Sequence, residues 1–210
     1  MNQKIILATL VVILFVVAGS TYYVVTKKSI QEESIDDTKT KVDISDWETL
    51  TNIKYNYKIK YPQNFIANCG APPAEYYSGV CIYDLDNPGS SLTIDIRDPG
   101  EYFGGLTEKQ LGTMNLPLNE YVDEIWQINK SEKSTDKQVS EIFEENIAGQ
   151  KAYRFLLTGS IMTETGGSLI KDKHILIFTA HPAGFNVIFI LPENPQVYLD
   201  ILSTFEFLES

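Results

Sequence analysis

The sequence predicts a protein of the α+β class, in which an antiparallel β-sheet is flanked by helices and preceded by one N-terminal transmembrane helix. Three observations support this class. Several short segments alternate between apolar and polar residues, two nearly continuous apolar runs are joined by a tight connection, and one stretch carries apolar residues at helical spacing. Because the chain has 210 residues, it is expected to form about one folded domain behind its N-terminal segment.

Residues 5–25 form an apolar run without a charged residue. In a helix this run would be about 30 Å long, which matches the hydrocarbon core of a bilayer. Tyr22 and Tyr23 lie near one end, where aromatic rings favour the membrane interface. The alternatives are a buried globular helix and a cleaved signal peptide with its cleavage site at Ala18-Gly19-Ser20, but the apolar run continues past that site. We therefore expect residues 1–28 to be an uncleaved anchor that crosses the membrane through residues 5–25.

Residues 29–46 are polar and charged, and they are interpreted as a flexible tether. A helical extension of the anchor is the alternative, but Ser29, Asp36 and Thr38 are weak helix formers. At Trp47 the composition changes to aromatic and β-branched residues, so the folded domain is predicted to span residues 47–210.

The net charge of the chain is −11, from 28 acidic and 17 basic residues. This balance argues against a nucleic-acid-binding protein, which needs basic residues to neutralise phosphates. Residues 1–28 contain three lysines and no acid, so the remainder carries a charge of −14. We expect anionic lipid head groups to repel such a domain, which would therefore stand off the membrane.

The first predicted strand pair opens the folded domain. Apolar and polar residues alternate over Tyr57–Tyr61, and Pro62 ends this strand because proline has no N–H for a ladder bond. Trp47–Thr51 also alternates and is the candidate partner strand.

A β-hairpin is predicted next, from Val80–Leu85 and Leu92–Ile96 with a turn at Asp86-Asn87-Pro88-Gly89. The alternation of its second strand separates two faces. One face carries Leu92, Ile94 and Ile96, and the other carries Thr93, Asp95 and Arg97.

An amphipathic helix is predicted in the middle of the domain, because apolar residues recur at i, i+3, i+4, i+7 and i+8. These residues are Leu118, Tyr121, Val122, Ile125 and Trp126. The spacing in residues 139–147 fits a helix as well as a strand. Ala148–Gly149 are expected to turn the chain into a strand at Tyr153–Leu157, and Gly166–Gly167 are expected in a loop.

Ile175–Phe178 and Phe185–Leu191 are nearly continuously apolar, which is typical of strands covered on both faces. His181–Gly184 joins them tightly, so they should pair antiparallel. A last helix is expected after a cap at Asn194, with Pro195 at its first position. Its apolar stripe would be Tyr198, Ile201, Leu202 and Phe205, followed by a short strand within Phe205–Leu208.

The two cysteines, Cys69 and Cys81, flank a loop and are predicted to form a disulfide outside the cytoplasm. Closing a loop of about 12 residues would stabilise the fold by about 3 kcal/mol. Two free buried thiols in a cytoplasmic domain are the alternative. The α-amino group and Lys4 on one side of the apolar run balance Lys27 and Lys28 on the other, so the cysteines decide the predicted topology. We expect a single-pass protein of the cell membrane with its folded domain on the extracytoplasmic side.

Asp84, Asp86 and Asn87 precede Gly89, and closely spaced oxygen ligands near a glycine can hold calcium. Their spacing is not that of the EF-hand loop, and no glutamate closes it. A plain hairpin turn is therefore the better interpretation.

Two other groups also have simple interpretations. His174 and His181 have no third zinc ligand that can be named, so separate structural roles are expected. Glu141, Glu144 and Glu145 fit a solvated acidic edge. The sequence contains no nucleophile elbow, phosphate loop or dinucleotide fingerprint. We therefore predict no catalytic residue, no metal ligand and no cofactor.

Three segments taken together resemble the PsbP-like domains that follow an N-terminal anchor or lipoprotein signal in many bacteria. They are Trp47 with Asn56–Pro62, Ala148–Arg154 and Ile201–Phe207. The similarity covers about residues 47–210. It implies an antiparallel sheet sandwiched by helices in a non-enzymatic accessory or binding domain. No photosystem contact and no manganese or calcium ligand is carried over, because nothing in the chain matches that role.

The anchor, the tether and the resemblance together predict a membrane-anchored, non-catalytic domain that binds another envelope or membrane protein. One alternative is a carrier of a small ligand, with the Cys69–Cys81 loop and the Tyr76–Tyr77 pair as lids. The other is a hydrolase with dispersed carboxylates, which would leave no linear signature.

Overall fold

The computed structural model of the chain describes residues 42–68, 78–101, 106–131, 137–163, 166–168, 173–193 and 195–209. The chain divides into two units, Met1–Val42 and Asp43–Ser210, and every helix and strand reported below belongs to the second. The predicted anchor, and the predicted tether up to residue 41, lie outside the described residues. Within the described ranges, no helix is long and apolar enough to cross a membrane.

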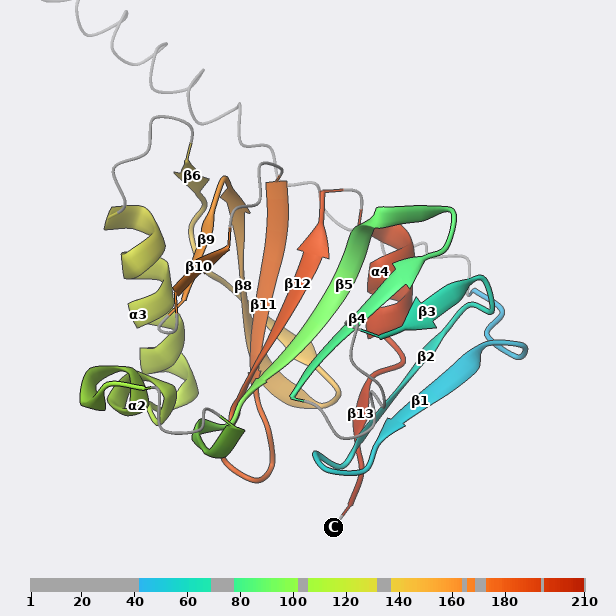
Figure 1. The fold of residues 1–210 in the computed structure, drawn as a ribbon, viewed down its shortest axis with the longest axis horizontal. Helices are drawn as coiled ribbons and strands as arrows, with labels where there is room; N and C mark the ends of the chain where they lie inside the picture. Colours follow the sequence, from blue (N-terminus) through green and yellow to red (C-terminus); the bar gives the residue numbers. More distant parts are fainter. Residues whose placement is uncertain are drawn as a thin grey trace, which may run out of the picture. The chain divides into compact units, whose positions relative to one another are not determined.

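The second unit is built on a large antiparallel sheet (Figure 1). Its eight described strands follow the order β3-β4-β5-β12-β11-β8-β6, and β7 also pairs with β8. These pairings are antiparallel, as the sequence predicts. The strands are β3 (Phe65–Ala67), β4 (Gly79–Asp84), β5 (Asn87–Arg97), β6 (Gln138–Val139), β7 (Phe143–Ile147), β8 (Gln150–Thr158), β11 (Lys173–Ala180) and β12 (Asn186–Pro192).

Two smaller sheets and three α-helices complete the described part of this unit. One small sheet has the order β1-β2-β13, and the other pairs β9 with β10. Their strands are β1 (Glu48–Asn52), β2 (Tyr57–Tyr61), β13 (Glu206–Phe207), β9 (Ile161–Thr163) and β10 (Gly166–Ser168). The helices are α2 (Glu108–Met114), α3 (Leu118–Ser131) and α4 (Gln196–Leu202), with a short 3-10 helix, η2, at Pro99–Glu101. The predicted α+β class is confirmed.

Helix α3 covers one face of the large sheet at strands β8, β11 and β12. It buries Tyr121, Val122 and Ile125 against residues that include Phe155 of β8 and Phe178 of β11. The two phenylalanine rings stack with their centroids 5.3 Å apart. The predicted amphipathic helix is confirmed, because its residues at helical spacing form this layer, which we call the α3 cluster.

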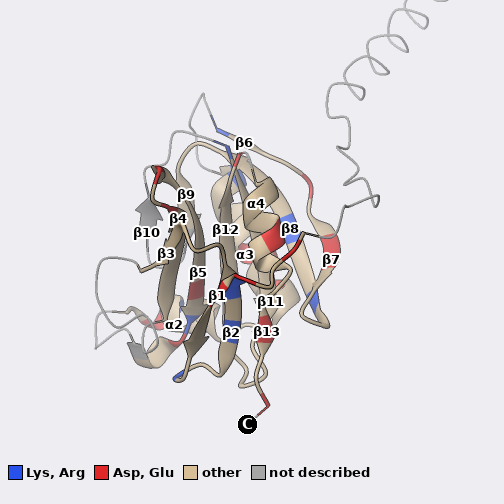
Figure 2. Cartoon of the chain, turned by 90° about the vertical axis from the view of Figure 1, so that its right-hand side faces the viewer, with Lys and Arg blue, Asp and Glu red and all other residues tan. Residues whose placement is uncertain are grey.

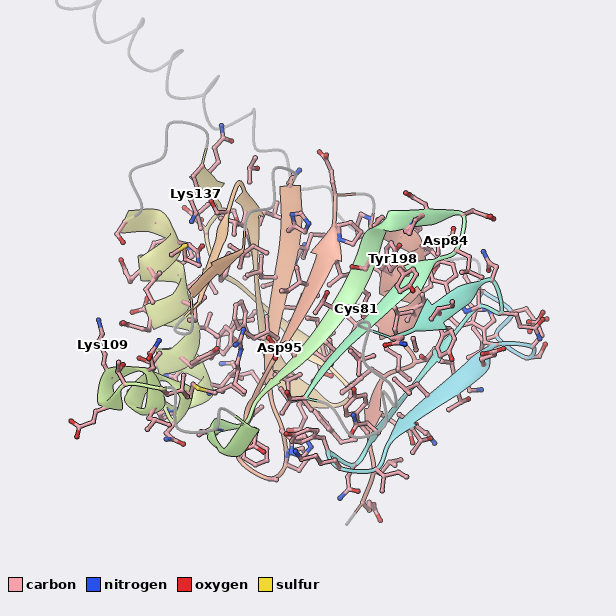
Figure 3. All side chains as sticks on the ribbon, in the orientation of Figure 1. Cys81, Asp84, Asp95, Lys109, Lys137 and Tyr198 are labelled. Atoms are coloured by element: carbon pink, nitrogen blue, oxygen red, sulfur yellow. The ribbon has the colours of Figure 1, made fainter. Side chains whose placement is uncertain are left out.

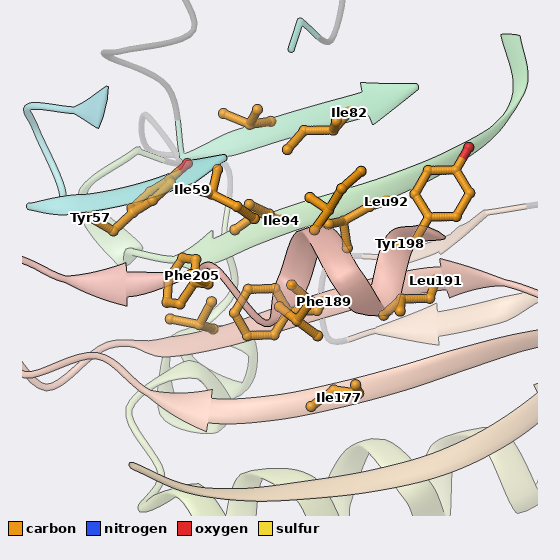
Figure 4. Packing of buried hydrophobic residues seen from close by; sticks show 14 of the residues in the cluster. Tyr57, Ile59, Ile82, Leu92, Ile94, Ile177, Phe189, Leu191, Tyr198 and Phe205 are labelled. Atoms are coloured by element: carbon orange, nitrogen blue, oxygen red, sulfur yellow. The ribbon is translucent and has the colours of Figure 1, made fainter. Parts of the chain in front are cut away.

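The opposite face of the large sheet packs against helix α4 and the β1-β2-β13 sheet (Figure 4). We call this layer the α4 cluster, and it includes Tyr57, Ile59, Ile82, Leu92, Ile94, Ile177, Phe189, Leu191, Tyr198 and Phe205. Strands β11 and β12 contribute to both clusters, with Leu176 and Ile188 on the α3 side. The prediction that their apolar runs are covered on both faces is therefore confirmed.

The predicted turn at Asp86–Gly89 is wrong. The connection between β4 and β5 is the pair Leu85–Asp86, because Asp84 already pairs with Asn87. Oδ1 of Asp84 accepts the N–H of Asp86 at 3.0 Å, which holds this tighter turn. Proline and glycine therefore lie within the first residues of β5, where they are exposed at the end of the hairpin.

Three further predictions differ in detail. Gly166–Gly167, expected in a loop, belong to β10 and pair with β9. Helix α4 begins at Gln196 with Pro195 at its N-cap, one residue later than predicted, and Asn194 lies outside the described residues. The ambiguous residues 139–147 contain the end of β6 and all of β7, so they are extended rather than helical.

The sequence interpretation missed helix α2 and strand β3. Helix α2 begins with a capping box, in which Thr107 Oγ1 accepts the N–H of Gln110 at 3.3 Å. In return, Gln110 Oε1 accepts the N–H of Thr107 at 2.7 Å. This Thr-x-x-Gln spacing is a local signal that the sequence offers. Strand β3 offers none, because it has three residues and depends on pairing with β4.

Candidate functional site

The polar strip of β5 is the first candidate site, and the name denotes Thr93, Asp95 and Arg97. Thr93 and Asp95 pair across the sheet with β12 residues that belong to the α3 side. Among the described residues, the buried part of the α3 cluster takes its sheet residues from β8, β9, β11 and β12 and none from β4 or β5. On this side β5 therefore carries polar side chains, as the alternation in the sequence predicted; Figure 3 labels Asp95 on β5 and Cys81 on β4.

A close ion pair lies within the polar strip. Nη2 of Arg97 is 2.8 Å from Oδ2 of Asp95, and the two side chains are 5% and 23% exposed. A guanidinium that is nearly withdrawn from water needs a compensating negative charge, so Asp95 stabilises Arg97 at this position. One strand thus carries fixed charges of both signs next to a hydroxyl group. Asp95, the more exposed member of the pair, is the charged group of this strip that can meet a polar ligand or a polar protein surface.

Cys81 lies on β4 directly opposite Thr93 of the polar strip. The Thr93 hydroxyl oxygen is 3.8 Å from the Cys81 sulfur. Cys81 is not a free thiol in the structure. Its predicted partner Cys69 and the predicted lid residues Tyr76 and Tyr77 lie outside the described residues. The pairing of Cys69 with Cys81 therefore stays a prediction.

A polar network lies beyond the end of β5. The Tyr55 hydroxyl donates to Oδ2 of Asp98 at 3.0 Å, and Oδ1 of Asp98 accepts the N–H of Gly100 at 2.9 Å. The N–H of Ala183 donates to Nδ1 of His181 at 3.0 Å, so the proton of the neutral ring is on Nε2. Nε2 then donates to the carbonyl oxygen of Tyr55 at 2.6 Å. His181 and Asp98 thus tie the β1–β2 hairpin to the large sheet.

The residues considered as metal ligands lie in separate parts of the fold. His174 is the second residue of β11 and His181 follows its last residue, so the two are about 23 Å apart along an extended chain. Oδ1 of Asp84 accepts hydrogen bonds from the N–H of Asp86 and from Nδ2 of Asn64, at 3.0 and 3.3 Å. Asp84 thus holds the β4–β5 turn, although this turn lies at Leu85–Asp86 and not at the predicted Asp86–Gly89. Within the described part of the chain, no group of three potential ligands comes together.

Strand β7 carries two adjacent glutamates, Glu144 and Glu145, and Figure 2 shows acidic residues in red on this strand. Their side chains have different surroundings. Glu144 pairs with Lys151 at 2.9 Å, and both side chains are exposed. Glu145 lies 3.6 Å from Nε of Arg154, and these side chains are only 25% and 27% exposed. Adjacent strand residues point to opposite faces, so the two carboxylates do not form one cluster. The prediction of a solvated acidic edge fits Glu144 and is wrong for Glu145.

The carboxyl group of Glu145 predicts a pH dependence of stability. Burial raises its pKa above the ordinary value of 4.5, and the charge of Arg154 opposes this shift. The folded state then binds the proton more tightly than the unfolded state, so ionisation of Glu145 costs stability. Relative to Glu145→Gln, the wild-type protein is expected to be most stable below pH 4.5 and to lose that advantage as the pH rises through the raised pKa of the folded state.

Urea unfolding of both proteins at several pH values measures this effect. Glu144→Gln is the matched control, because it removes an exposed carboxylate from the same strand. The same pH dependence in the two variants would contradict the role of burial at Glu145.

Two buried asparagines that hold the α3 layer were missed by sequence reasoning. Asn129 of α3 bonds to both main-chain groups of Met162 in β9. Asn186 of β12 donates to two carbonyl groups at the end of α2 and in the α2–α3 connection, at 3.2 and 3.0 Å. The available signal was the position of Asn129, four residues after Ile125 on the apolar stripe. A polar residue on such a stripe indicates a buried hydrogen-bond partner.

Comparisons with known proteins show similarity at the level of the fold. No family model matches the chain, and no curated protein matches it. Among solved structures, the cyanobacterial PsbP protein (CyanoP) from Synechocystis sp. PCC 6803 is 18% identical, with a TM-score of 0.44 over 79% of this chain and 95% of that chain. The Ran-binding protein Mog1p of Saccharomyces cerevisiae is 7% identical, with a TM-score of 0.41 over 78% of this chain and 96% of that chain. The chain is thus similar in structure to these two proteins, and the membrane-anchored type of PsbP-like domain stays a prediction.

Proposed function

We propose that the chain is a membrane-anchored, extracytoplasmic and non-catalytic domain that binds another protein of the envelope or membrane. The observation that carries the proposal is that side chains which could act as catalytic groups have structural roles instead. His181, Asp98 and Asp84 are engaged in hydrogen bonds that hold loops and turns. Two other features, the polar strip of β5 and the edge strand β7, are suited to recognition of a protein surface.

The N-terminal sequence supports the membrane attachment. Residues 5–25 are long and apolar enough to span a bilayer, and residues 29–46 are polar enough to act as a tether. Cys81, which is not a free thiol, supports an oxidising location outside the cytoplasm.

The proposal predicts one dominant partner in the cell. The full-length chain with a C-terminal tag would be crosslinked in its own cells, purified under denaturing conditions and analysed by mass spectrometry. We expect one protein at near-stoichiometric yield. The same tag on residues 1–46 alone is the control, because it keeps the anchor and tether without the folded domain. If no protein exceeds this control at several salt concentrations, the proposed function is contradicted.

A carrier of a small ionic ligand is the second candidate function. The Asp95–Arg97 pair favours it, because fixed charges of both signs lie on β5, the strand that pairs with β4. Native mass spectrometry of the purified full-length protein tests this candidate, together with thermal shifts across a panel of small ions. A bare polypeptide mass and no shift would contradict it, whereas a ligand lost in Asp95→Asn would support it.

A further inference from the structure

Strand β7 forms an edge of the large sheet. Within the described part of the chain it pairs with β8 alone. The connection is a two-residue turn in which Ala148 and Gly149 have φ of 53° and 77°, so it is of the type I′ that closes on the pair Ile147 and Gln150. Hydrogen-bonded and non-bonded pairs alternate along an antiparallel ladder. The N–H and C=O of Glu144 therefore point away from β8, where an added strand can bond to them.

The side chains of β7 also favour an added strand. Phe143 is 38% exposed, and its ring centroid lies 5.6 Å from the guanidinium carbon of Arg154. The other exposed large apolar residues of the described ranges lie in turns or connecting segments: Val42, Ile53 and Leu85. On the same face of β7 as Phe143, Oε1 of Glu145 is buried yet accepts no hydrogen bond from the residues that the structure describes. This edge thus combines an exposed ring with an acceptor that lacks a donor.

We propose that β7 is the docking edge for an extended segment of the partner protein in which lysine or arginine alternates with apolar residues. The inference rests on the proposed protein-binding function. Main-chain bonds to Glu144 continue the sheet and supply affinity. A basic side chain on the Glu145 face pairs with the carboxylate of Glu145, whose side chain is 25% exposed, and lays its aliphatic stem on the Phe143 ring.

The charges of β7 favour binding of this basic segment over pairing with β7 of a second copy of the chain. Two β7 strands paired with each other would bring Glu144 and Glu145 close to identical carboxylates, and like charges across a ladder are destabilising. Charged edge strands are a common protection against such self-pairing. A basic segment meets no such repulsion, and the net charge of −11 also attracts it.

A pair of substitutions at one residue tests the docking edge. Glu144→Pro removes the outward N–H, whereas Glu144→Thr loses the same carboxylate and keeps the N–H. The probe is a labelled synthetic peptide in which lysine and valine alternate, titrated with the full-length protein and followed by fluorescence anisotropy. We expect Glu144→Pro to weaken binding about tenfold relative to Glu144→Thr. A peptide in which glutamate replaces lysine is expected to bind at least about tenfold more weakly than the basic peptide.

A second pair covers the case in which Glu144→Pro fails to fold. Phe143→Lys places a positive charge on the docking edge, and Ile53→Lys makes the same charge change on an exposed apolar residue of the β1–β2 turn. Phe143→Lys is expected to weaken binding of the basic peptide about tenfold, and Ile53→Lys by less than about twofold.

The outcomes separate this inference from the proposed function. Equal affinity in the two members of each pair, or equal affinity for the basic and acidic peptides, would overturn the docking edge. If in-cell crosslinking still captures one dominant partner, the protein-binding function stands and only its location on β7 fails. Loss of that partner from Glu144→Pro, but not from Glu144→Thr, supports both.

Discussion

Replacement of Phe189 by alanine is expected to lower the free energy of unfolding of the domain by about 3–5 kcal/mol. Phe189 is fully buried in the α4 cluster, where it pairs with Ile94 of β5 and Ile177 of β11. Its ring meets the Phe205 ring edge to face, with the centroids 5.0 Å apart. Alanine would remove the ring contact with Phe205 and leave a cavity beside strands that are held by their ladders and cannot easily close it.

Urea unfolding of the full-length protein, followed by tryptophan fluorescence, measures this loss. Trp47 packs against the α4 cluster and Trp126 against the α3 cluster, so each layer has its own reporter. Both signals are expected to change at the same, lower urea concentration if the two layers unfold together. Phe189→Leu is the control, because it keeps most of the buried volume and should cost less than about 1.5 kcal/mol. Equal stability of the alanine and leucine variants would contradict the packing.

Asn129→Ala is expected to cost about 2–4 kcal/mol, the second large effect. Asn129 is 1% exposed, and its side chain links helix α3 to strand β9. Its Nδ2 donates to the carbonyl oxygens of Ile125 and Met162 at 2.8 and 2.7 Å, and its Oδ1 accepts the N–H of Met162 at 2.9 Å. Alanine would leave the N–H and C=O of Met162 without these partners in a partly buried place, and each such group costs about 1–3 kcal/mol.

Hydrogen exchange distinguishes this local role from a general loss of stability. In Asn129→Ala, the amide of Met162 is expected to exchange faster than the change in global stability explains, because its acceptor is gone. The same urea series gives the global value. Gln127→Ala is the control, since Gln127 is an exposed residue of the same helix. If the two variants are equally stable, the proposed link between α3 and β9 is wrong.

Local patterns were sufficient to predict the elements that have a clear period. The alternation at Tyr57–Tyr61 became β2, and the stripe from Leu118 to Trp126 became α3. Strand and helix periods are properties of the backbone, so they appear in the sequence without knowledge of the neighbours. The turn after β4 was mispredicted because Pro88 and Gly89 are typical turn residues, while the pairing of Asp84 with Asn87 closes the hairpin earlier.

The contacts of the candidate sites could not be predicted in this way. His181 bonds to Tyr55, which is 126 residues away, and Asn129 bonds to Met162, which is 33 residues away. Glu145 and Arg154 are closer in sequence, but their half-buried pairing depends on which edge of the sheet the β7–β8 hairpin forms. No periodic pattern in the sequence predicts these side-chain contacts, because they depend on the order of the strands in the sheet.

The sequence by itself determined the class of the fold, the faces of its strands and the polar character of Thr93, Asp95 and Arg97 on β5. Only the tertiary structure decided that the α3 cluster is built on β8, β9, β11 and β12, so that the polar strip is not part of it. It also decided that β7 is an edge strand with a half-buried glutamate. The physical reason is that side-chain alternation is local, whereas burial depends on which elements pack on a face.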